Sequence, residues 1–166
     1  DLENKDPVDD NTLFRIASMT KAITSTCIYQ LIDKDILSLD TNLKDFFPEI
    51  SDKKVIRGFD DNGDPILSDV SNDINIGHLL THTSGFAYEI WNESIAKLVE
   101  KGDLQSAFAN NDEFLKAPLV FEPGSDWEYG IGIDWLGVLI EKINDCSLQE
   151  YMHTHIFEPL GMSNTS

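Results

Sequence analysis

The sequence predicts a mostly helical chain with one small β-hairpin, and three observations support this prediction. Apolar residues recur at helical spacing after residue 18 and again after residue 134. Between these segments, Asn62-Gly63 separates two short apolar runs, and this dipeptide is typical of a hairpin turn. We therefore expect a hairpin near residues 54–68 and helices through most of the remaining chain.

The first predicted helix covers residues 18–34. Residues 1–11 are acidic and contain Pro7, so we expect a loop or a frayed end there. Residues 13–17 are largely apolar, which we interpret as a short buried segment leading into the helix. The apolar side chains that define the helix are Met19, Ile23, Cys27, Leu31 and Ile32.

The other predicted helices are short, except the one that begins at Asp134. Pro48 is expected to stop a helix that precedes it, because proline cannot continue a helix. A helix that starts near Gly77 should end in the turn at residues 83–85. Further helices are predicted at residues 90–101, 104–109, 112–116 and 147–157.

The charge balance limits the partners of this protein. Thirty acidic residues against 12 basic ones give a net charge of -18, which would repel nucleic-acid phosphates and anionic lipids. No apolar run is long enough to span a bilayer, and no signal peptide is visible. We therefore expect no nucleic-acid partner and no membrane span, and the sequence assigns no compartment.

The sequence predicts no metal and no cofactor. Cys27 and Cys146 lack metal-ligand or disulfide-framework spacing, so we expect free thiols. The acidic turn at residues 60–64 lacks the glutamate that a calcium loop of the EF-hand type needs. His78 and His82 are four residues apart, but the acidic residue of a zinc-protease motif is absent between them. Structural, hydrogen-bonded histidines are the expected alternative.

Ser18 and Lys21 are the candidate nucleophile and base. Residues three apart on a helix share a face, so this hydroxyl and this amine can meet, and a lysine with a lowered pKa can accept the serine proton. Spacing alone decides nothing, because the same pattern occurs at Ser51 with Lys54 and at Ser94 with Lys97. Those pairs lie in polar segments, whereas Ser18 follows an apolar one. The alternative role of Ser18 is a helix N-cap.

Tyr129 is the third candidate. It follows the Pro123-Gly124 turn, and the glycines at positions 130 and 132 allow the backbone to approach another segment closely. A tyrosine at such a junction between loop and helix can present its hydroxyl to a cleft. The alternative is a buried aromatic anchor.

Four segments together resemble one known superfamily. They are residues 14–21, 78–86, 123–129 and 159–162, in this order along the chain. The chain is similar to serine β-lactamases and penicillin-binding proteins, and most of all to the class C-related branch with family VIII carboxylesterases and fungal acyltransferases. The resemblance implies that Ser18 is the acylated nucleophile, Lys21 its neighbouring base, and Tyr129 a proton shuttle for the leaving group.

The resemblance also implies the rest of the architecture. Family members have strands before this region and a strand with a third motif after it, so residues 1–166 are expected to be the helix-rich part of a larger α/β catalytic domain. Most of the main sheet is then absent from this chain. A second chain or a further segment is expected to complete the fold and to supply the second oxyanion donor beside the Ser18 N–H.

The function implied is a serine hydrolase for small-molecule esters or amides. Lactamases and peptidases of the superfamily carry Tyr-x-Asn, but Ile131 occupies the third position here, which favours ester substrates. We therefore expect a carboxylesterase for short acyl esters. The alternatives on this scaffold are an acyltransferase, a D-aminopeptidase and a weak β-lactamase. An alternative of another class is a non-catalytic ligand-binding domain.

Overall fold

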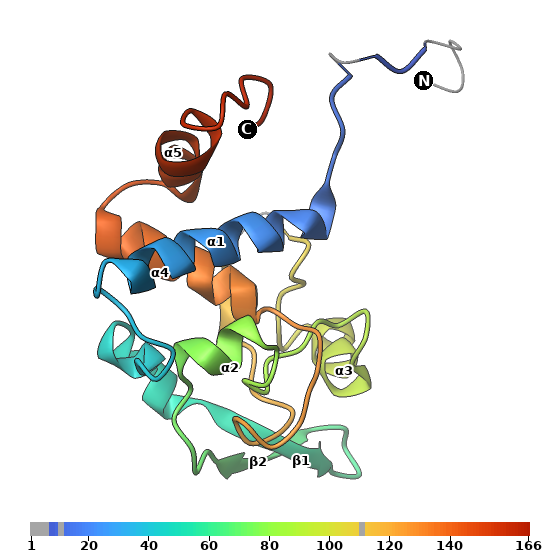
Figure 1. Ribbon diagram of the computed structural model, residues 1–166. Coiled ribbons are helices and arrows are strands. Elements are labelled where there is room, and N and C mark those ends of the chain that lie inside the picture. Colours follow the sequence, from blue (N-terminus) through green and yellow to red (C-terminus); the bar gives the residue numbers. More distant parts are fainter. Residues whose placement is uncertain (1–6, 10–11, 110–111) are drawn as a thin grey trace.

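The computed structural model describes residues 7–9, 12–109 and 112–166, and this part of the chain is mostly helical with one two-stranded antiparallel sheet (Figure 1). The prediction of a helical chain with a small hairpin is therefore confirmed. The helices are α1 (Thr20–Asp33), α2 (Ile76–Leu80), α3 (Glu93–Lys101), α4 (Gly132–Asn144) and α5 (Leu148–Met152), and the strands are β1 (Lys54–Phe59) and β2 (Pro65–Asp69).

Tighter helical turns replace some of the predicted helices. A 3-10 turn occupies Leu43–Asp45, and Pro48 begins a second turn, Pro48–Asp52, instead of ending a helix. Proline suits the first position of a helical turn because its missing N–H would have no partner there. The helix predicted at residues 104–109 is wrong, because that segment is irregular. Two further turns are the 3-10 turn Glu113–Lys116 and the π turn His153–Phe157 that extends α5.

Helix α4 is the centre of the core. It packs against α1, α2 and α5, and Figure 1 shows α1 crossing directly over it. The two helices bury apolar side chains against each other, as their helical spacing predicts. These side chains are Cys27, Ile28 and Leu31 from α1 and Leu136, Leu139 and Ile140 from α4. Both cysteines are free thiols, as expected from their spacing.

The hairpin forms where the Asn-Gly turn predicts it. Ile56 pairs with Leu67, and a bulge follows Ile56. The Asp60 carboxylate accepts hydrogen bonds from the N–H groups of Asn62 and Asp64, both at 2.9 Å. The acidic turn is therefore held by backbone hydrogen bonds to its own first carboxylate.

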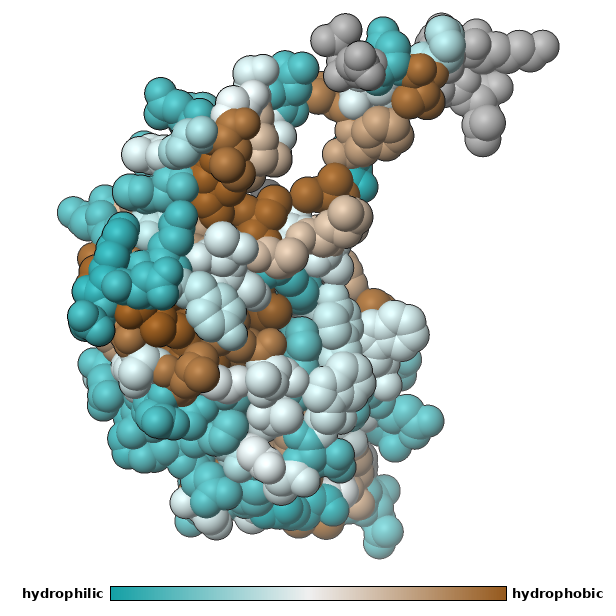
Figure 2. Space-filling view, viewed as in Figure 1, coloured by the Kyte–Doolittle hydropathy of each residue, from teal (hydrophilic) through white to brown (hydrophobic). Residues whose placement is uncertain are grey.

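The prediction that residues 13–17 are a buried segment is wrong. Leu13 and Phe14 are 76% and 66% exposed, and Ile16 and Ala17 are also exposed. Figure 1 shows this segment leaving α1 as an extended arm, and Figure 2 shows apolar side chains gathered where the arm meets α1. The apolar residues of this segment are therefore not part of the buried core of the described structure.

Lys53 lies in the polar segment that contains Ser51 and Lys54, yet it is not fully exposed. Its side chain is half-buried, and its Nζ donates to the Leu115 and Ala117 carbonyls at 2.7 and 3.0 Å. Burial lowers the pKa of Lys53 to about 8, against an opposing effect of the Glu49 carboxylate. Lys53 thereby ties the start of β1 to the segment that follows the Glu113–Lys116 turn.

No helix in the described part of the chain is both long and apolar enough to cross a membrane.

Candidate active site

Ser18 lies in the 3-10 turn Ala17–Met19, which runs directly into α1. Ala17 has a φ of 46°, in the left-handed region that non-glycine residues rarely adopt. Strain of this kind often occurs at functional sites. The Ser18 side chain is exposed, and its hydroxyl makes no hydrogen bond within the described part of the chain. Neither helical segment has a side-chain cap, so the N-cap alternative for Ser18 is not supported.

Lys21 extends from the first turn of α1 towards two tyrosines. Its Nζ lies 5.0 Å from the centroid of the Tyr88 ring and 5.2 Å from that of the Tyr129 ring. A cation at this distance from an aromatic face is attracted by the electrons of the ring. The structure therefore brings together two of the three predicted site residues, Lys21 and Tyr129, from distant parts of the sequence.

Ser18 and Lys21 share a cavity of about 340 Å³ between α1 and α4. Asp134, Gly137 and Val138 line it from the side of α4. Tyr129 is not among the residues that line this cavity, although its ring lies near the Lys21 amine. Lys21 thus contacts Tyr129 and lines the same cavity as Ser18, but no hydrogen bond joins the Ser18 hydroxyl to the Lys21 amine within the described residues.

Tyr88 and Asp134 form a hydrogen bond beside the Lys21 amine. The Tyr88 hydroxyl donates to Asp134 Oδ2 at 2.5 Å. Burial, and then the Asp134 carboxylate, raise the pKa of Tyr88 above its ordinary value, so its phenol keeps its proton. Of the two phenols near Lys21, Tyr129 is therefore the one whose hydroxyl is not already committed to a carboxylate.

His82 supports the Tyr129 ring. The centroids of the two rings are 4.8 Å apart, and the backbone N–H of Gly130 lies 3.5 Å from His82 Nδ1. The His82 carbonyl also accepts a hydrogen bond from the Glu128 N–H at 3.0 Å. Burial, and then the nearby Lys21 charge, lower the pKa of His82, which favours its neutral form. His82 is thus a structural histidine beside the site.

Gly130 allows the tyrosine-bearing loop to pack tightly. A Cβ at this position would lie 2.6 Å from the Ala87 Cα and closer still to the Phe86 carbonyl oxygen. Such contacts are far shorter than van der Waals separation, so the backbone can pass here only without a side chain. The segment that the sequence predicted the glycine to approach is therefore residues 86–87.

Sequence reasoning missed Tyr88 and Asp134. They are 46 positions apart, and no spacing rule connects them. Asp134 was expected to open a helix, and it does lie in the first turn of α4. The signal that could have found it is its position on the first turn of the helix that follows the tyrosine loop.

The other Ser-x-x-Lys pairs and the candidate metal ligands do not form a site in the described part of the structure. Ser51 and Lys54 are both exposed, and Lys97 lies over the Phe59 ring, 5.1 Å from its centroid. No group of three or more histidines, cysteines or acidic residues within the described ranges is arranged to hold a metal ion. His78 instead forms a capping box with Asn75 at the start of α2.

Comparison with known proteins shows which proteins this chain is similar to. The chain is 36% identical over 160 residues to the ML-236A carboxylate methylbutanoyltransferase of Penicillium citrinum, covering 95% of this chain and 38% of that protein. It is 34% identical over 169 residues to the lovastatin esterase of Penicillium rubens, covering 97% and 41%. The unliganded simvastatin synthase of Aspergillus terreus matches with a TM-score of 0.84 and 34% identity, covering 96% and 41%.

The chain thus spans about two fifths of the length of these relatives. The family described as Beta-lactamase matches residues 1–166, which is the whole chain. This match agrees with the resemblance carried by the Ser18, Lys21 and Tyr129 segments. The chain belongs to the β-lactamase family.

Proposed function

We propose that the protein is a serine hydrolase that cleaves carboxylic esters through an acyl-enzyme on Ser18. The observation that carries this proposal is the position of Lys21, which lines one cavity with Ser18 and whose amine lies 5.2 Å from the Tyr129 ring centroid. Two relatives that bear the names esterase and methylbutanoyltransferase support acyl chemistry.

The proposed reaction begins with attack by Ser18 Oγ on the ester carbonyl carbon. Lys21, as the free amine, accepts the hydroxyl proton, and the backbone N–H of Ser18 stabilises the oxyanion. Collapse of the tetrahedral intermediate breaks the bond to the leaving alcohol. Tyr129 and Lys21 deliver the proton to that oxygen, and water then hydrolyses the acyl-enzyme by the reverse sequence.

The environment of Ile131 supports ester over amide substrates. Ile131 stands where lactamases and peptidases of the superfamily carry an asparagine, and its side chain is 1% exposed. A buried isoleucine offers no hydrogen bond to a substrate amide. A β-lactam or peptide would therefore lack one of its expected contacts, whereas an ester does not need it.

Acyl transfer to an alcohol is the second candidate, and the methylbutanoyltransferase relative favours it. The two functions share the acyl-enzyme and differ in the acceptor that takes the acyl group. Adding a small alcohol during ester turnover distinguishes them, because a transferase forms the new ester in preference to the free acid.

Labelling with a fluorophosphonate tests the proposal. In the full-length protein we expect one covalent adduct, on the peptide that contains Ser18, and loss of that adduct in Ser18→Ala. Ser51→Ala is the matched control, because Ser51 is exposed and belongs to another Ser-x-x-Lys pair. A label elsewhere, or none, would contradict the proposal. Equal rates of p-nitrophenyl acetate hydrolysis by wild type and Ser18→Ala would exclude catalysis by Ser18 and would favour the alternative of a non-catalytic ligand-binding domain.

A further inference from the structure

Two rows of aromatic rings run outward from the Lys21 amine. In the first row, the Tyr129 ring packs against His82 at 4.8 Å, and His82 meets the Trp127 ring edge to face at 6.4 Å. Each member therefore contacts the next through its ring. The row begins at a group that the proposed reaction uses and ends at Trp127.

The second row starts at the other tyrosine beside the same amine. Tyr88 stacks on Phe108 with ring centroids 6.2 Å apart, and the two tyrosine rings are themselves 5.6 Å apart. Both rows therefore start from one joined pair of rings next to Lys21.

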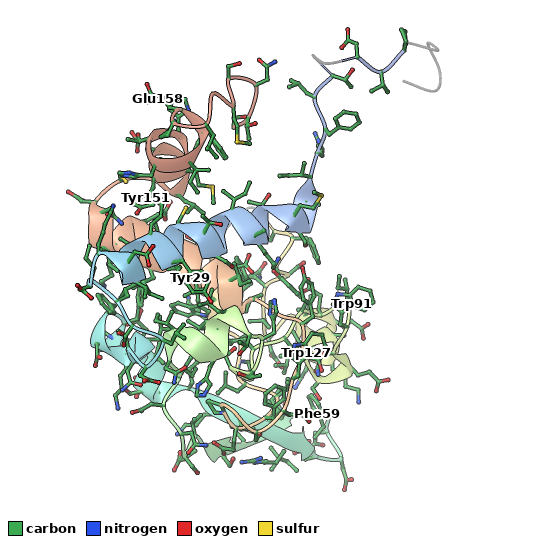
Figure 3. All side chains as sticks on the ribbon, in the orientation of Figure 1. Tyr29, Phe59, Trp91, Trp127, Tyr151 and Glu158 are labelled. Atoms are coloured by element: carbon green, nitrogen blue, oxygen red, sulfur yellow. The ribbon has the colours of Figure 1, made fainter. Side chains whose placement is uncertain are left out.

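The rows differ sharply in exposure from their inner to their outer ends. Tyr88 is 7% exposed and Tyr129 is half-buried, whereas Trp127 and Phe108 are 61% and 67% exposed. Large aromatic side chains that remain in water at the end of such a row are typical of binding surfaces, because their apolar area is still available to a ligand. In Figure 3, Trp127 lies on the side of the molecule that also carries Trp91, away from Tyr151.

We propose that Trp127 and Phe108 bind the apolar part of a neutral, medium-chain ester during the reaction on Ser18. This inference rests on the proposed function and names the substrate class for the same site. The net charge of -18 disfavours anionic substrates such as coenzyme A thioesters or free carboxylates. A neutral ester is not repelled by the negative charge of the protein, and an extended apolar group can pack against the exposed rings.

The kinetic test compares p-nitrophenyl decanoate with p-nitrophenyl acetate in the full-length protein. If the two rings contact the alkyl chain of the ester, Trp127→Ala and Phe108→Ala should each lower the decanoate-to-acetate ratio of kcat/KM about tenfold. The matched control is Trp91→Ala, because Trp91 is 63% exposed but has no ring contact with another described aromatic residue. An equal loss on both esters, an unchanged ratio, or the same change in the control would overturn the proposal.

A binding measurement separates this inference from the proposed reaction. In Ser18→Ala, which cannot form an acyl-enzyme, decan-2-one should still bind in a calorimetric titration, and adding Trp127→Ala should weaken that binding about tenfold. If wild type shows no acyl chemistry but decan-2-one still binds, the proposed reaction would be overturned and the binding role of Trp127 would remain. No binding of decan-2-one, or equal competition by the decanoate anion at low salt, would overturn the substrate class.

Discussion

Lys21 and Lys53 occupy similar aromatic surroundings but have different partners. Each amine lies over two aromatic rings at similar distances. For Lys21 they are 5.0 and 5.2 Å, to Tyr88 and Tyr129, and for Lys53 they are 5.6 and 5.8 Å, to Phe86 and Trp135. A description of aromatic contacts alone would not distinguish the two lysines.

Hydrogen bonds distinguish them. The Lys53 amine donates to two backbone carbonyls, at 2.7 and 3.0 Å, whereas the Lys21 amine makes no hydrogen bond or ion pair within the described part of the chain. An ammonium held by two carbonyls fixes two segments of backbone together. An amine without such partners is available to a reacting group.

The comparison teaches that a lowered pKa does not by itself mark a catalytic lysine. Burial lowers the pKa of Lys53 to about 8, yet none of the described residues that line the cavity beside it is a serine or a cysteine. Ser18 lines the cavity of Lys21. Perturbed groups also occur in structural networks, so access to a nucleophile decides the assignment.

Replacing Lys21 gives the largest expected effect. In Lys21→Met the apolar stem is kept and the amine is lost, so ester hydrolysis should fall about 1,000-fold because the serine proton has no acceptor. The loss of the ring contacts should change the free energy of unfolding by less than about 1 kcal/mol. Steady-state rates and urea denaturation measure both quantities. Activity within about tenfold of wild type would refute the assignment of Lys21 as the base.

Replacing Lys53 should produce the opposite pattern. Lys53→Met removes the donor of two carbonyls, and the free energy of unfolding should fall by about 2 kcal/mol. The rate of ester hydrolysis per folded molecule should stay close to wild type. Urea denaturation and active-site titration give the two values. A large loss of activity without loss of stability would break the distinction between the lysines.

The sequence predicts the fold where local patterns decide it. The apolar spacing of α1 and α4 identifies both helices, and Asn62-Gly63 identifies the hairpin. The same reasoning fails at residues 13–17, because an apolar run does not reveal whether another element covers it. Burial depends on long-range packing, which periodicity does not encode.

The residues of the site also fall into two groups, those that a sequence pattern relates and those that only the packing brings together. Ser18 and Lys21 are close in sequence, so helical spacing relates them, and Gly130 reveals that its loop approaches another segment. The hydrogen bond between Tyr88 and Asp134 joins positions from a loop and a helix. Only the packing of that loop against the N-terminus of α4 brings the two side chains together, and no pattern of residue types predicts it.

The pair of Tyr88 and Asp134 should have a moderate effect on the reaction. Tyr88→Phe and Asp134→Asn should each lower kcat/KM about tenfold, because the rings beside Lys21 lose their fixed position.

Two outcomes would remove this role. The double variant should be no slower than either single variant, because both changes break one hydrogen bond. Independent, additive losses would show that the two residues act separately. A rate of Asp134→Asn equal to that of wild type would show that the carboxylate has no part in the reaction.

The smallest expected effect is the pH dependence of stability at Lys53. Its pKa is about 8 in the folded protein and 10.5 in the absence of burial, so the unfolded chain binds more protons between these values. Stability therefore rises with pH in this range, and the gain is lost as pH falls through 8, where both states carry the charge. Relative to Lys53→Met, wild type should gain about 1 kcal/mol between about pH 8 and about pH 9.5.

Urea denaturation of both proteins at each pH measures this gain. Lys97→Met is the control for the loss of one lysine charge, because Lys97 is exposed. A constant difference between wild type and Lys53→Met across that range would mean that Lys53 titrates as it does in water. The contrast with Lys21 would then rest on hydrogen bonding alone, since the two carbonyl contacts of Lys53 do not depend on a lowered pKa.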